Sequence, residues 1–318
     1  MVERTGLNGS RPFSEPSLFW QELARKHGDD LERHGLHLVK RRQALRYFNW
    51  RWRWGGMRRS RQFRFLFSHS TPLAILRCLF TPARLSGPSW HAVPWTRRER
   101  WLYVFAVRLL WEYTRRHDEL GVLSLPEPQL GNPLPVQWDG RLISQDLANS
   151  ALEANAIARA LDGASPGSIV EVGAGYGRTA YALLKVFPKA THTVVDIEPA
   201  LTISRWYLTS LFPGARLRFL QPEEAQRLRE GSADLVVSIS SLHEMRRDQV
   251  QAYLDLFDRI AGGGVVYLKQ WERWTNPVDG VTLAFDEYPV PTGWRSVFDE
   301  VAPVQTNFRH AAWRVPSA

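Results

Sequence analysis

Three glycines at alternate positions could build a ligand site in the middle of this 318-residue chain. Gly173, Gly175 and Gly177 stand in the stretch VEVGAGYGRTA, between an apolar run and a segment of helical periodicity that starts at Arg178. Glycines in a strand-to-helix turn adopt positive φ and let the backbone approach a bound molecule closely. The carboxyl ends of parallel strands are also where such folds bind ligands. The spacing therefore predicts a binding turn, with a purely structural turn as the alternative.

The residues around this turn favour a cationic ligand. A dinucleotide-binding turn would carry its third glycine at the position of Arg178. Glu171 lies two residues before the first glycine, where its carboxylate would repel a pyrophosphate and attract an ammonium group. Asp196 ends the next apolar run and can accept hydrogen bonds from ribose hydroxyls. S-adenosylmethionine has an ammonium, a sulfonium and a ribose but no phosphate, so we predict it as the cofactor.

We expect the cofactor to contact residues that follow the successive strands of one sheet edge. These residues are Glu171, Gly173, Gly175, Tyr176, Gly177, Asp196, Ile197, Gln221 and Ser240. The assignment of Gln221 to the adenine side rests on strand order alone.

A hydroxyl acceptor would need a base, because a hydroxyl is a poor nucleophile at neutral pH. The stretch SISSLHEM places His243 and Glu244 directly after an apolar run. Histidine titrates nearest to the working pH, so we predict His243 as the general base and Glu244 as the residue that orients it or binds the acceptor. The alternatives are a capping or surface role for His243, and catalysis by proximity without a strong base.

The next strand end, YLKQWERW, offers groups that suit a sugar-like acceptor. Trp271 can stack on a sugar ring, while Lys269 or Arg273 can bind a hydroxyl or a phosphate. We also assign Asp146 to the substrate. A solvated loop with one aromatic tucked into the core is the alternative. The acidic residues of this half show no recognisable ligand spacing, so we predict no metal.

These strand ends meet only if the second half forms one parallel sheet. From Gly167 onward, short apolar runs alternate with helical patterns, which is typical of a doubly wound, Rossmann-like α/β fold. The upstream part is helical in pattern, and a stretch rich in proline and glycine follows it. We expect a helical, arginine-rich N-terminal region at 1–125, a linker loop at 126–144 and a cofactor-binding core at 145–318.

Residues 145–318 resemble the class I S-adenosylmethionine-dependent methyltransferases in the glycine turn, the following acidic residue and the strand-helix alternation. The stretches EVGAGYGRTAYALLKVFP, VVDIEPALTISRWYLTSLFP, SISSLHEM, YFNWRWRW and RSRQFRFLF are similar to bacterial sugar O-methyltransferases of natural-product and polysaccharide clusters. The resemblance implies direct, in-line methyl transfer to a sugar hydroxyl of a glycoside, glycan or natural product. It also implies that the basic N-terminal region is a substrate lid.

The positive charge lies in the first part of the chain, where residues 1–120 hold 23 lysines and arginines against 10 acidic residues. The basic residues Lys40, Arg41, Arg42, Arg46, Arg51, Arg53, Arg58, Arg59, Arg61 and Arg64 alternate with Tyr47, Phe48, Trp50, Trp52 and Trp54. Arginine interleaved with aromatics is typical of RNA-binding surfaces, so an RNA methyltransferase is the alternative function. The simplest explanation of the positive charges is a solvated helix face. The stretch RRERWLYVFAVRLLWEYTRR fits an amphipathic helix with a basic outer face and with Trp101, Val104, Phe105 and Leu109 inside.

Cys78 is the single cysteine, which excludes an intrachain disulfide and a cysteine pair for metal or redox chemistry. No stretch approaches 18 uninterrupted apolar residues, and the N-terminus lacks the apolar run of a signal peptide. We therefore expect a cytoplasmic protein without a transmembrane segment. The sequence does not indicate the oligomeric state.

Overall fold

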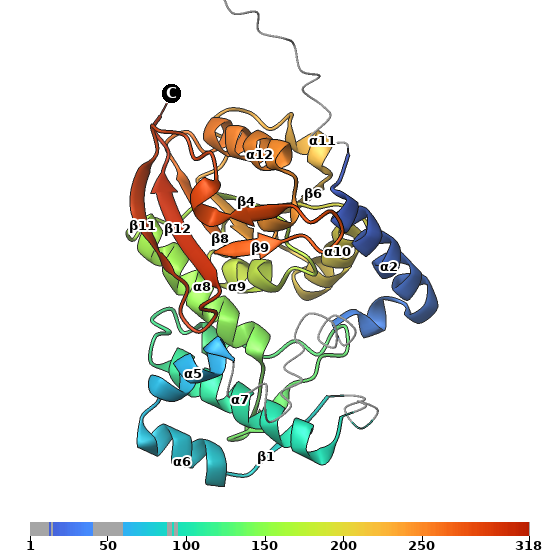
Figure 1. The fold of residues 1–318 in the computed structure, drawn as a ribbon, viewed down its shortest axis with the longest axis vertical. Helices are drawn as coiled ribbons and strands as arrows, with labels where there is room; N and C mark the ends of the chain where they lie inside the picture. The colour runs from blue at the N-terminus through green and yellow to red at the C-terminus, as the bar shows by residue number, and fades with distance from the viewer. Residues whose placement is uncertain (1–12, 14, 41–59, 88–90, 92–94, 318) are drawn as a thin grey trace, which may run out of the picture.

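The computed structural model describes residues 13, 15–40, 60–87, 91 and 95–317. A seven-stranded sheet lies at its centre, in the order β11-β12-β8-β7-β4-β5-β6 (Figure 1). Its strands are β4 (Ser168–Val172), β5 (Thr191–Val195), β6 (Leu217–Leu220), β7 (Leu235–Ile239), β8 (Val265–Trp271), β11 (Arg295–Val301) and β12 (Phe308–Arg314). Strands β4 to β8 pair in parallel, and β12 runs antiparallel to both β8 and β11. The predicted α/β sheet is confirmed.

Helices cover both faces of this sheet. The covering helices are α8 (Gln145–Leu161), α9 (Arg178–Val186), α10 (Ala200–Leu211) and α12 (Arg247–Ile260). Strand β4 shows how the sequence alternates between the faces, because Ile169 belongs to the apolar cluster of α8, α9 and α10, whereas Val170 and Val172 belong to that of α12. The doubly wound arrangement is thereby confirmed. Shorter elements are α11 (Pro222–Ala225), η4 (Leu242–Glu244), η5 (Phe285–Glu287) and the hairpin of β9 (Arg273–Thr275) and β10 (Thr282–Ala284).

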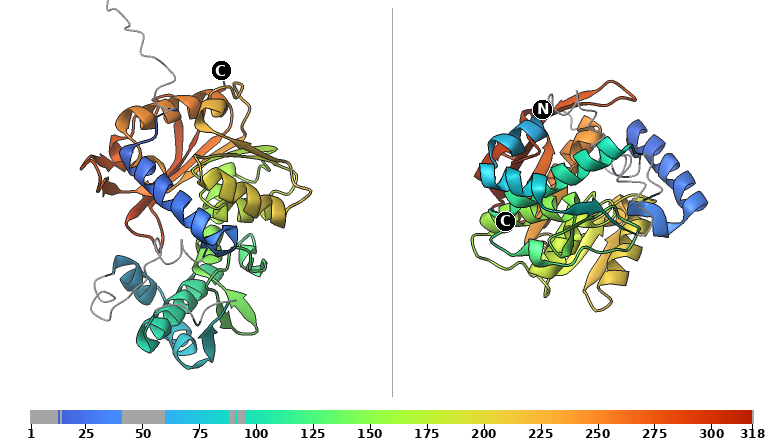
Figure 2. Two further views of the ribbon diagram at one scale, coloured as in Figure 1. Left: turned by 90° about the vertical axis from the view of Figure 1, so that its right-hand side faces the viewer. Right: turned by 90° about the horizontal axis from the view of Figure 1, so that it is seen from below.

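The described N-terminal part divides between two places. Helix α2 (Leu18–His34), followed by η1 (Leu36–Leu38), lies along the core, as Figures 1 and 2 show. At the other end lie α5 (Arg61–Ser68), α6 (Pro72–Phe80), α7 (Arg97–Arg115), η3 (Val122–Ser124) and a small antiparallel sheet of β1 (Ala83–Leu85), β2 (Val136–Trp138) and β3 (Arg141–Ile143).

Strands β2 and β3 correct the prediction that 126–144 is a loop. Prolines and glycines do occur there, but Val136, Trp138 and Ile143 are buried, and β2 pairs with β1 far upstream in the chain. A single buried cluster then runs from Leu109 on α7 to Leu147 on α8 without a gap. The segment is therefore part of the packed interior, while the boundaries of the predicted domains stay a prediction.

Helix α7 forms as predicted but is not a surface helix. Thr96 and Glu99 build a capping box at its start, and every residue from Leu102 to Thr114 is buried. Arg108, expected on a basic outer face, lies over the Trp138 ring, while Trp101, expected inside, is half exposed. Periodicity did not reveal that α6, α8 and the small sheet surround this helix.

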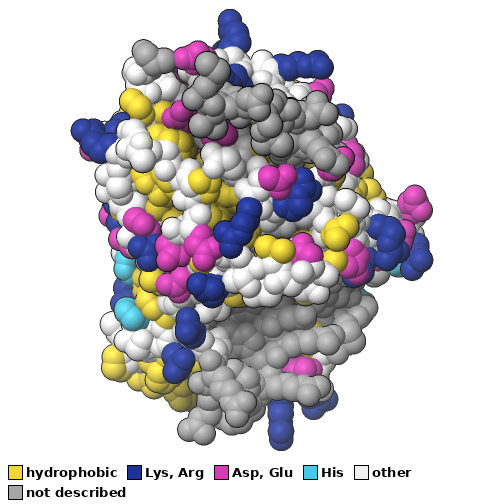
Figure 3. All heavy atoms as spheres, turned by 45° about the horizontal axis from the view of Figure 1, so that its top comes forward, with side chains coloured by type: hydrophobic (Ala, Val, Ile, Leu, Met, Phe, Trp, Pro, Cys, Tyr) yellow, Lys and Arg dark blue, Asp and Glu magenta, His cyan; other side chains and the backbone are white. Residues whose placement is uncertain are grey.

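Basic and acidic side chains are interspersed over the upper part of the face drawn in Figure 3, and hydrophobic side chains gather at its lower left edge, where α6 lies. Within the described ranges, no helix is both long and apolar enough to cross a membrane.

Candidate cofactor and acceptor site

The three glycines of the turn after β4 differ in what surrounds them. A Cβ on Gly173, where φ is +78°, would lie 2.2 Å from the Ser241 hydroxyl oxygen, and one on Gly177 would lie 2.9 Å from Leu208 of α10. A Cβ on Gly175, where φ is +59°, would meet no atom within 4 Å. Gly173 and Gly177 are therefore required by close packing, and Gly175 borders open space that a ligand can fill.

Asp196 follows β5 and faces this turn. Its Oδ2 accepts a hydrogen bond from the Gly175 N–H at 2.9 Å, and its Oδ1 accepts one from the Ile197 N–H at 2.8 Å. Burial nevertheless raises the pKa of Asp196 to about 7, and the carboxylates of Glu171 and Glu198 add to this effect. The side chain is therefore held in place by the backbone and titrates near neutral pH.

Glu171 has a partner that the sequence did not indicate. On β4 its Oε2 lies 3.0 Å from Nε2 of His192 on β5, and both side chains are buried. Strands β4 and β5 are parallel neighbours, so the contact joins two adjacent strands of the sheet. The proposed contact of Glu171 with an ammonium group would have to form beside this one.

A pocket opens at the ends of β4 and β5 and is closed by the N-terminal segment. It is lined by Phe13, Pro16, Ser17, Trp20, Val172, Gly173, Val195, Asp196, Ile197, Pro222, Ser241, Met245, Gln249 and Tyr253. Ser17 donates from its Oγ to the Glu244 carbonyl at 2.9 Å, and the Phe13 ring packs edge-on against Tyr253. The buried indole N–H of Trp20 has no hydrogen-bond partner among the described residues.

The sequence missed these N-terminal contributions. Nothing in a local pattern links Ser17 to Glu244, which are separated by 227 positions. The one available signal was Ser17 as a helix cap, which it is, since its side chain accepts from the Trp20 N–H.

Three of the nine predicted cofactor residues line the pocket, namely Gly173, Asp196 and Ile197, and the other six do not. Among those six, Gln221 and Ser240 stand at strand ends whose next residue does line it. Gln221 is exposed and caps α11, while its neighbour Pro222 faces the pocket. Ser240 is exposed with φ of +56°, while the buried Ser241 faces the pocket. In both cases the predicted strand end is right and the side chain that turns inward is the next one, because the strand period of two does not extend through the turn.

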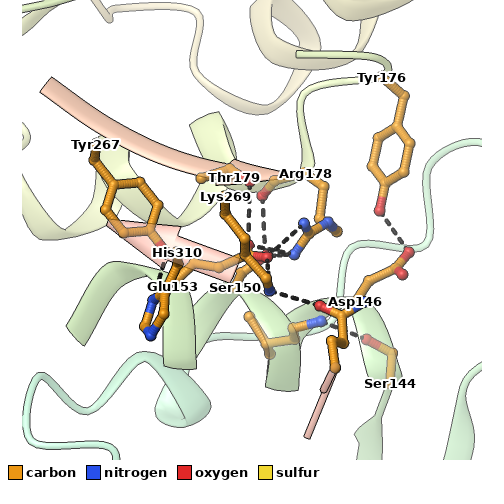
Figure 4. Close-up of polar contacts among 12 residues, drawn as sticks. Ser144, Asp146, Ser150, Glu153, Tyr176, Arg178, Thr179, Tyr267, Lys269 and His310 are labelled. Atoms are coloured by element: carbon orange, nitrogen blue, oxygen red, sulfur yellow. Dashed lines mark hydrogen bonds and ion pairs between the residues drawn. The ribbon is translucent and has the colours of Figure 1, made fainter. Parts of the chain in front are cut away.

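Tyr176 points away from the pocket, toward the N-terminal part. Its hydroxyl donates to Oδ2 of Asp146 at 2.5 Å (Figure 4), so these two predicted site residues contact each other, while the buried Oδ1 of Asp146 has no hydrogen-bond partner among the described residues. Lys40 lies over the ring of Tyr176 and forms a buried ion pair with Glu127 at 3.2 Å. Lys40 is thus not part of a basic surface. The predicted basic residues from Arg41 to Arg59, and the aromatics between them, fall outside the described residues.

His243 on η4 is buried in a position that fixes its tautomer. The side-chain amide of Gln270 donates to the Ser238 carbonyl at 3.0 Å, and its Oε1 accepts from the Ser241 N–H at 2.9 Å. The same oxygen lies 3.0 Å from Nδ1 of His243. A carbonyl oxygen can only accept, so Nδ1 carries the proton and Nε2 keeps a free lone pair. Gln270, which the sequence did not single out, is therefore a positioning residue.

Burial also sets the protonation states of the predicted catalytic pair. It lowers the pKa of His243 to about 4, which keeps the imidazole neutral. Burial, and then the nearby Asp196 carboxylate, raise the pKa of Glu244 to about 8. Glu244 Oε1 lies 3.8 Å from His243 Nε2, beyond hydrogen-bond distance. At neutral pH, His243 is a free base beside an uncharged carboxyl group.

A second cavity lies beyond the end of β8. It is lined by Arg61, Trp271, Glu272, Arg273, Ala284, Phe285, Asp286, Asn307 and Arg309. The ring centroids of His243 and Trp271 are 6.4 Å apart. The structure thus brings two predicted substrate residues, Trp271 and Arg273, to one cavity next to the predicted base.

Lys269, the third basic or aromatic residue predicted at this strand end, is not in the cavity. Its Nζ is buried 2.8 Å from Glu153 of α8 and 2.6 Å from the Gln305 side-chain oxygen. Arg178 pairs with the same Glu153 at 2.7 Å (Figure 4). Strand β8 continues to Trp271, so Lys269 is an interior strand residue that faces α8. Lys269 therefore does not share the cavity of Trp271 and Arg273, and its role in substrate binding stays a prediction.

Comparison with known proteins assigns the part of the chain that carries this site. Residues 170–266 match the family model described as "Methyltransferase domain". This segment is therefore similar to methyltransferase domains.

One similar protein is O-methyltransferase 3 of Dictyostelium discoideum, 28% identical over 111 residues. That match covers 33% of this chain and spans only 25% of the relative's length.

Solved structures are similar to about half of the chain. A SAM-dependent methyltransferase from Aquifex aeolicus is 16% identical with a TM-score of 0.38, over 46% of this chain and 81% of its own. The 1,6-didemethyltoxoflavin-N1-methyltransferase of Burkholderia thailandensis is 19% identical with a TM-score of 0.39, over 52% of this chain and 77% of its own.

Proposed function

We propose that this chain is an S-adenosylmethionine-dependent O-methyltransferase that acts on a sugar hydroxyl. The observation that carries the proposal is His243. It is a buried, neutral histidine with a free Nε2, two residues after Ser241 of the first pocket and with its ring centroid 6.4 Å from that of Trp271 of the second cavity. A base in this position can serve a hydroxyl acceptor that reaches it from the cavity.

The residues of the first pocket fit the cofactor. Asp196 offers carboxylate oxygens, and the Trp20 indole N–H is a buried donor without a partner among the described residues. Gly175, in the adjoining turn, leaves open space. We infer that Asp196 binds the ribose and that Trp20, Ser17 and Tyr253 enclose the remaining cofactor. S-adenosylmethionine would supply an electrophilic methyl group in this pocket.

The second cavity has the chemistry of a sugar site. Trp271 offers a flat apolar face, and the arginines and carboxylates around it can donate to and accept from neighbouring hydroxyls. Arg309 is paired with Asp299 at 2.6 Å, and the guanidinium of Arg273 lies 4.0 Å from Glu287. Basic and acidic groups are both present, which suits a polyhydroxylated ring better than a polyanion such as RNA.

Different residues of the chain would orient the acceptor, accept its proton and hold the base in place. Trp271 and the polar groups of the cavity orient the acceptor so that one hydroxyl lies near Nε2 of His243. In a transfer that breaks the sulfonium–methyl bond and leaves S-adenosylhomocysteine, Nε2 would accept the proton of the attacking hydroxyl. Gln270 holds the imidazole in the tautomer that can do so. Burial around His243 keeps water from competing for the methyl group.

Methyl transfer tests this assignment through His243→Ala. Release of S-adenosylhomocysteine in the presence of sugar acceptors should fall by at least about 100-fold, the usual scale for a lost acid-base group, while cofactor affinity stays the same. His69→Ala, a change at the exposed histidine that directly follows α5, is the matched control and should leave turnover intact. Turnover of His243→Ala within a few fold of the parent would remove His243 from the mechanism.

A further inference from the structure

Helix α6 presents an apolar face to solvent. Leu73, Leu76 and Phe80 follow one another at helical spacing with 76%, 50% and 79% of their surface exposed, and Leu79 lies beside them at 40%. Phe67 at the end of α5 is also half exposed. Single exposed hydrophobic residues are common on protein surfaces, but a contiguous group on one nine-residue helix indicates an interaction surface.

The opposite side of α6 is firmly anchored, so this exposure is not a sign of loose packing. Ala74 and Cys78 are buried against the body, and Thr71 caps the helix by accepting from the Ala74 N–H. Arg108 of α7 donates to the carbonyls of Arg77 and Thr81 at 2.8 and 2.7 Å. The helix therefore has a fixed inner face and a free apolar outer face.

Positive charge is concentrated in the segment of the chain that contains α6. Residues 60–117 contain ten arginines, Arg61, Arg64, Arg77, Arg84, Arg97, Arg98, Arg100, Arg108, Arg115 and Arg116. Their two acidic residues are both engaged, Glu99 in the capping box of α7 and Glu112 in ion pairs with Arg77 and Arg115. Asp139, from the turn between β2 and β3, is also paired with Arg77. Arg64 and Arg84, on the elements before and after α6, are exposed.

We propose that the outer face of α6 binds the surface of an anionic membrane. Leucines and a phenylalanine on one side of a short helix can enter the boundary between headgroups and acyl chains, and arginines beside them attract anionic headgroups. A second copy of this chain fits less well, because two such faces would bring like charges together. The proposal does not depend on the proposed methyl transfer.

Vesicle co-sedimentation of the full chain tests the proposal. The parent should bind vesicles of mixed phosphatidylglycerol and phosphatidylcholine, and about 0.5 M salt or vesicles of phosphatidylcholine alone should weaken the binding. In the double variant Leu73→Ser, Phe80→Ser, the fraction of protein bound to vesicles should fall by at least about fivefold, because the variant removes the two most exposed apolar groups of this face. Both positions are on the surface, so the thermal unfolding temperature should stay the same.

The matched control is Val278→Ser, Val301→Ser, which changes two exposed hydrophobic residues outside this face and should bind like the parent. Equal loss in both double variants, or no binding of the parent to anionic vesicles, would overturn the proposal. It would also be overturned if the parent were a dimer in solution that the Leu73→Ser, Phe80→Ser variant dissociates, since the face would then join two copies.

Discussion

Asp196 combines two backbone hydrogen bonds with a pKa near neutrality. Its oxygens accept from the N–H groups of Gly175 and Ile197, but burial raises its pKa to about 7. A ribose hydroxyl donates more strongly to a carboxylate than to a carboxylic acid. Cofactor binding should therefore improve as Asp196 loses its proton.

We predict that the dissociation constant for S-adenosylhomocysteine falls roughly eightfold between about pH 6 and pH 7.5, because only the ionised form of Asp196 binds well. Isothermal titration calorimetry at several pH values measures this change. Asp196→Asn should bind more weakly and show a flat profile over the same range. A parent profile as flat as that of Asp196→Asn would contradict the role of Asp196.

Residue types predicted the site better than they predicted which way each side chain points. Trp271 and Arg273 line one cavity as expected, and His243 lies next to it. Lys269 lies outside this cavity because the strand continues past it, and its charge is neutralised by Glu153 across a helix-sheet interface. Ser17, Trp20 and Gln270 could not be found, because their contacts join segments far apart in the sequence.

At the scale of elements, the glycine turn depends on its fit against the loop after β7. The backbone at Gly173 approaches Ser241 so closely that an added Cβ would overlap its side chain. The turn and the segment that carries His243 are therefore packed as one unit.

We predict that Gly173→Ala lowers the free energy of unfolding by about 1–3 kcal/mol, through overlap with Ser241 and an unfavourable positive φ. Urea denaturation measures the loss. Adding Ser241→Gly should recover part of it, since this change removes the atoms that collide.

Gly175→Ala is the matched comparison, because its Cβ would meet nothing. It should cost only about 1 kcal/mol of stability from backbone strain and should instead weaken cofactor binding. Equal stability of the two single variants would show that Gly173 is not packed as described.

In the second half of the chain, short apolar runs form the strands and segments of helical periodicity form the helices. The alternation of strands with covering helices was therefore predictable from the sequence. Strands β2 and β3 were not, because each has three residues and their stability comes from pairing with β1 and from burial of Trp138. Helix α7 formed as predicted, but its burial on all sides depends on neighbours that its own periodicity does not reveal.

The molecule as a whole is less divided than its charge distribution suggests. One apolar cluster joins α7 of the basic half to α8 and the sheet, and the segment from Pro16 to Trp20 forms a wall of the pocket at β4 and β5. The N-terminal part therefore contributes both to the folding of the core and to the site.

Calorimetric titration of the full chain with S-adenosylmethionine tests the central claim most directly. We predict saturable binding to one site, largely lost in both Asp196→Ala and Gly175→Val, because the first removes the ribose acceptor and the second fills the open space beside the turn. Circular dichroism should show both variants folded. Absence of binding by the parent, or unchanged affinity in both variants, would contradict the assignment of this pocket.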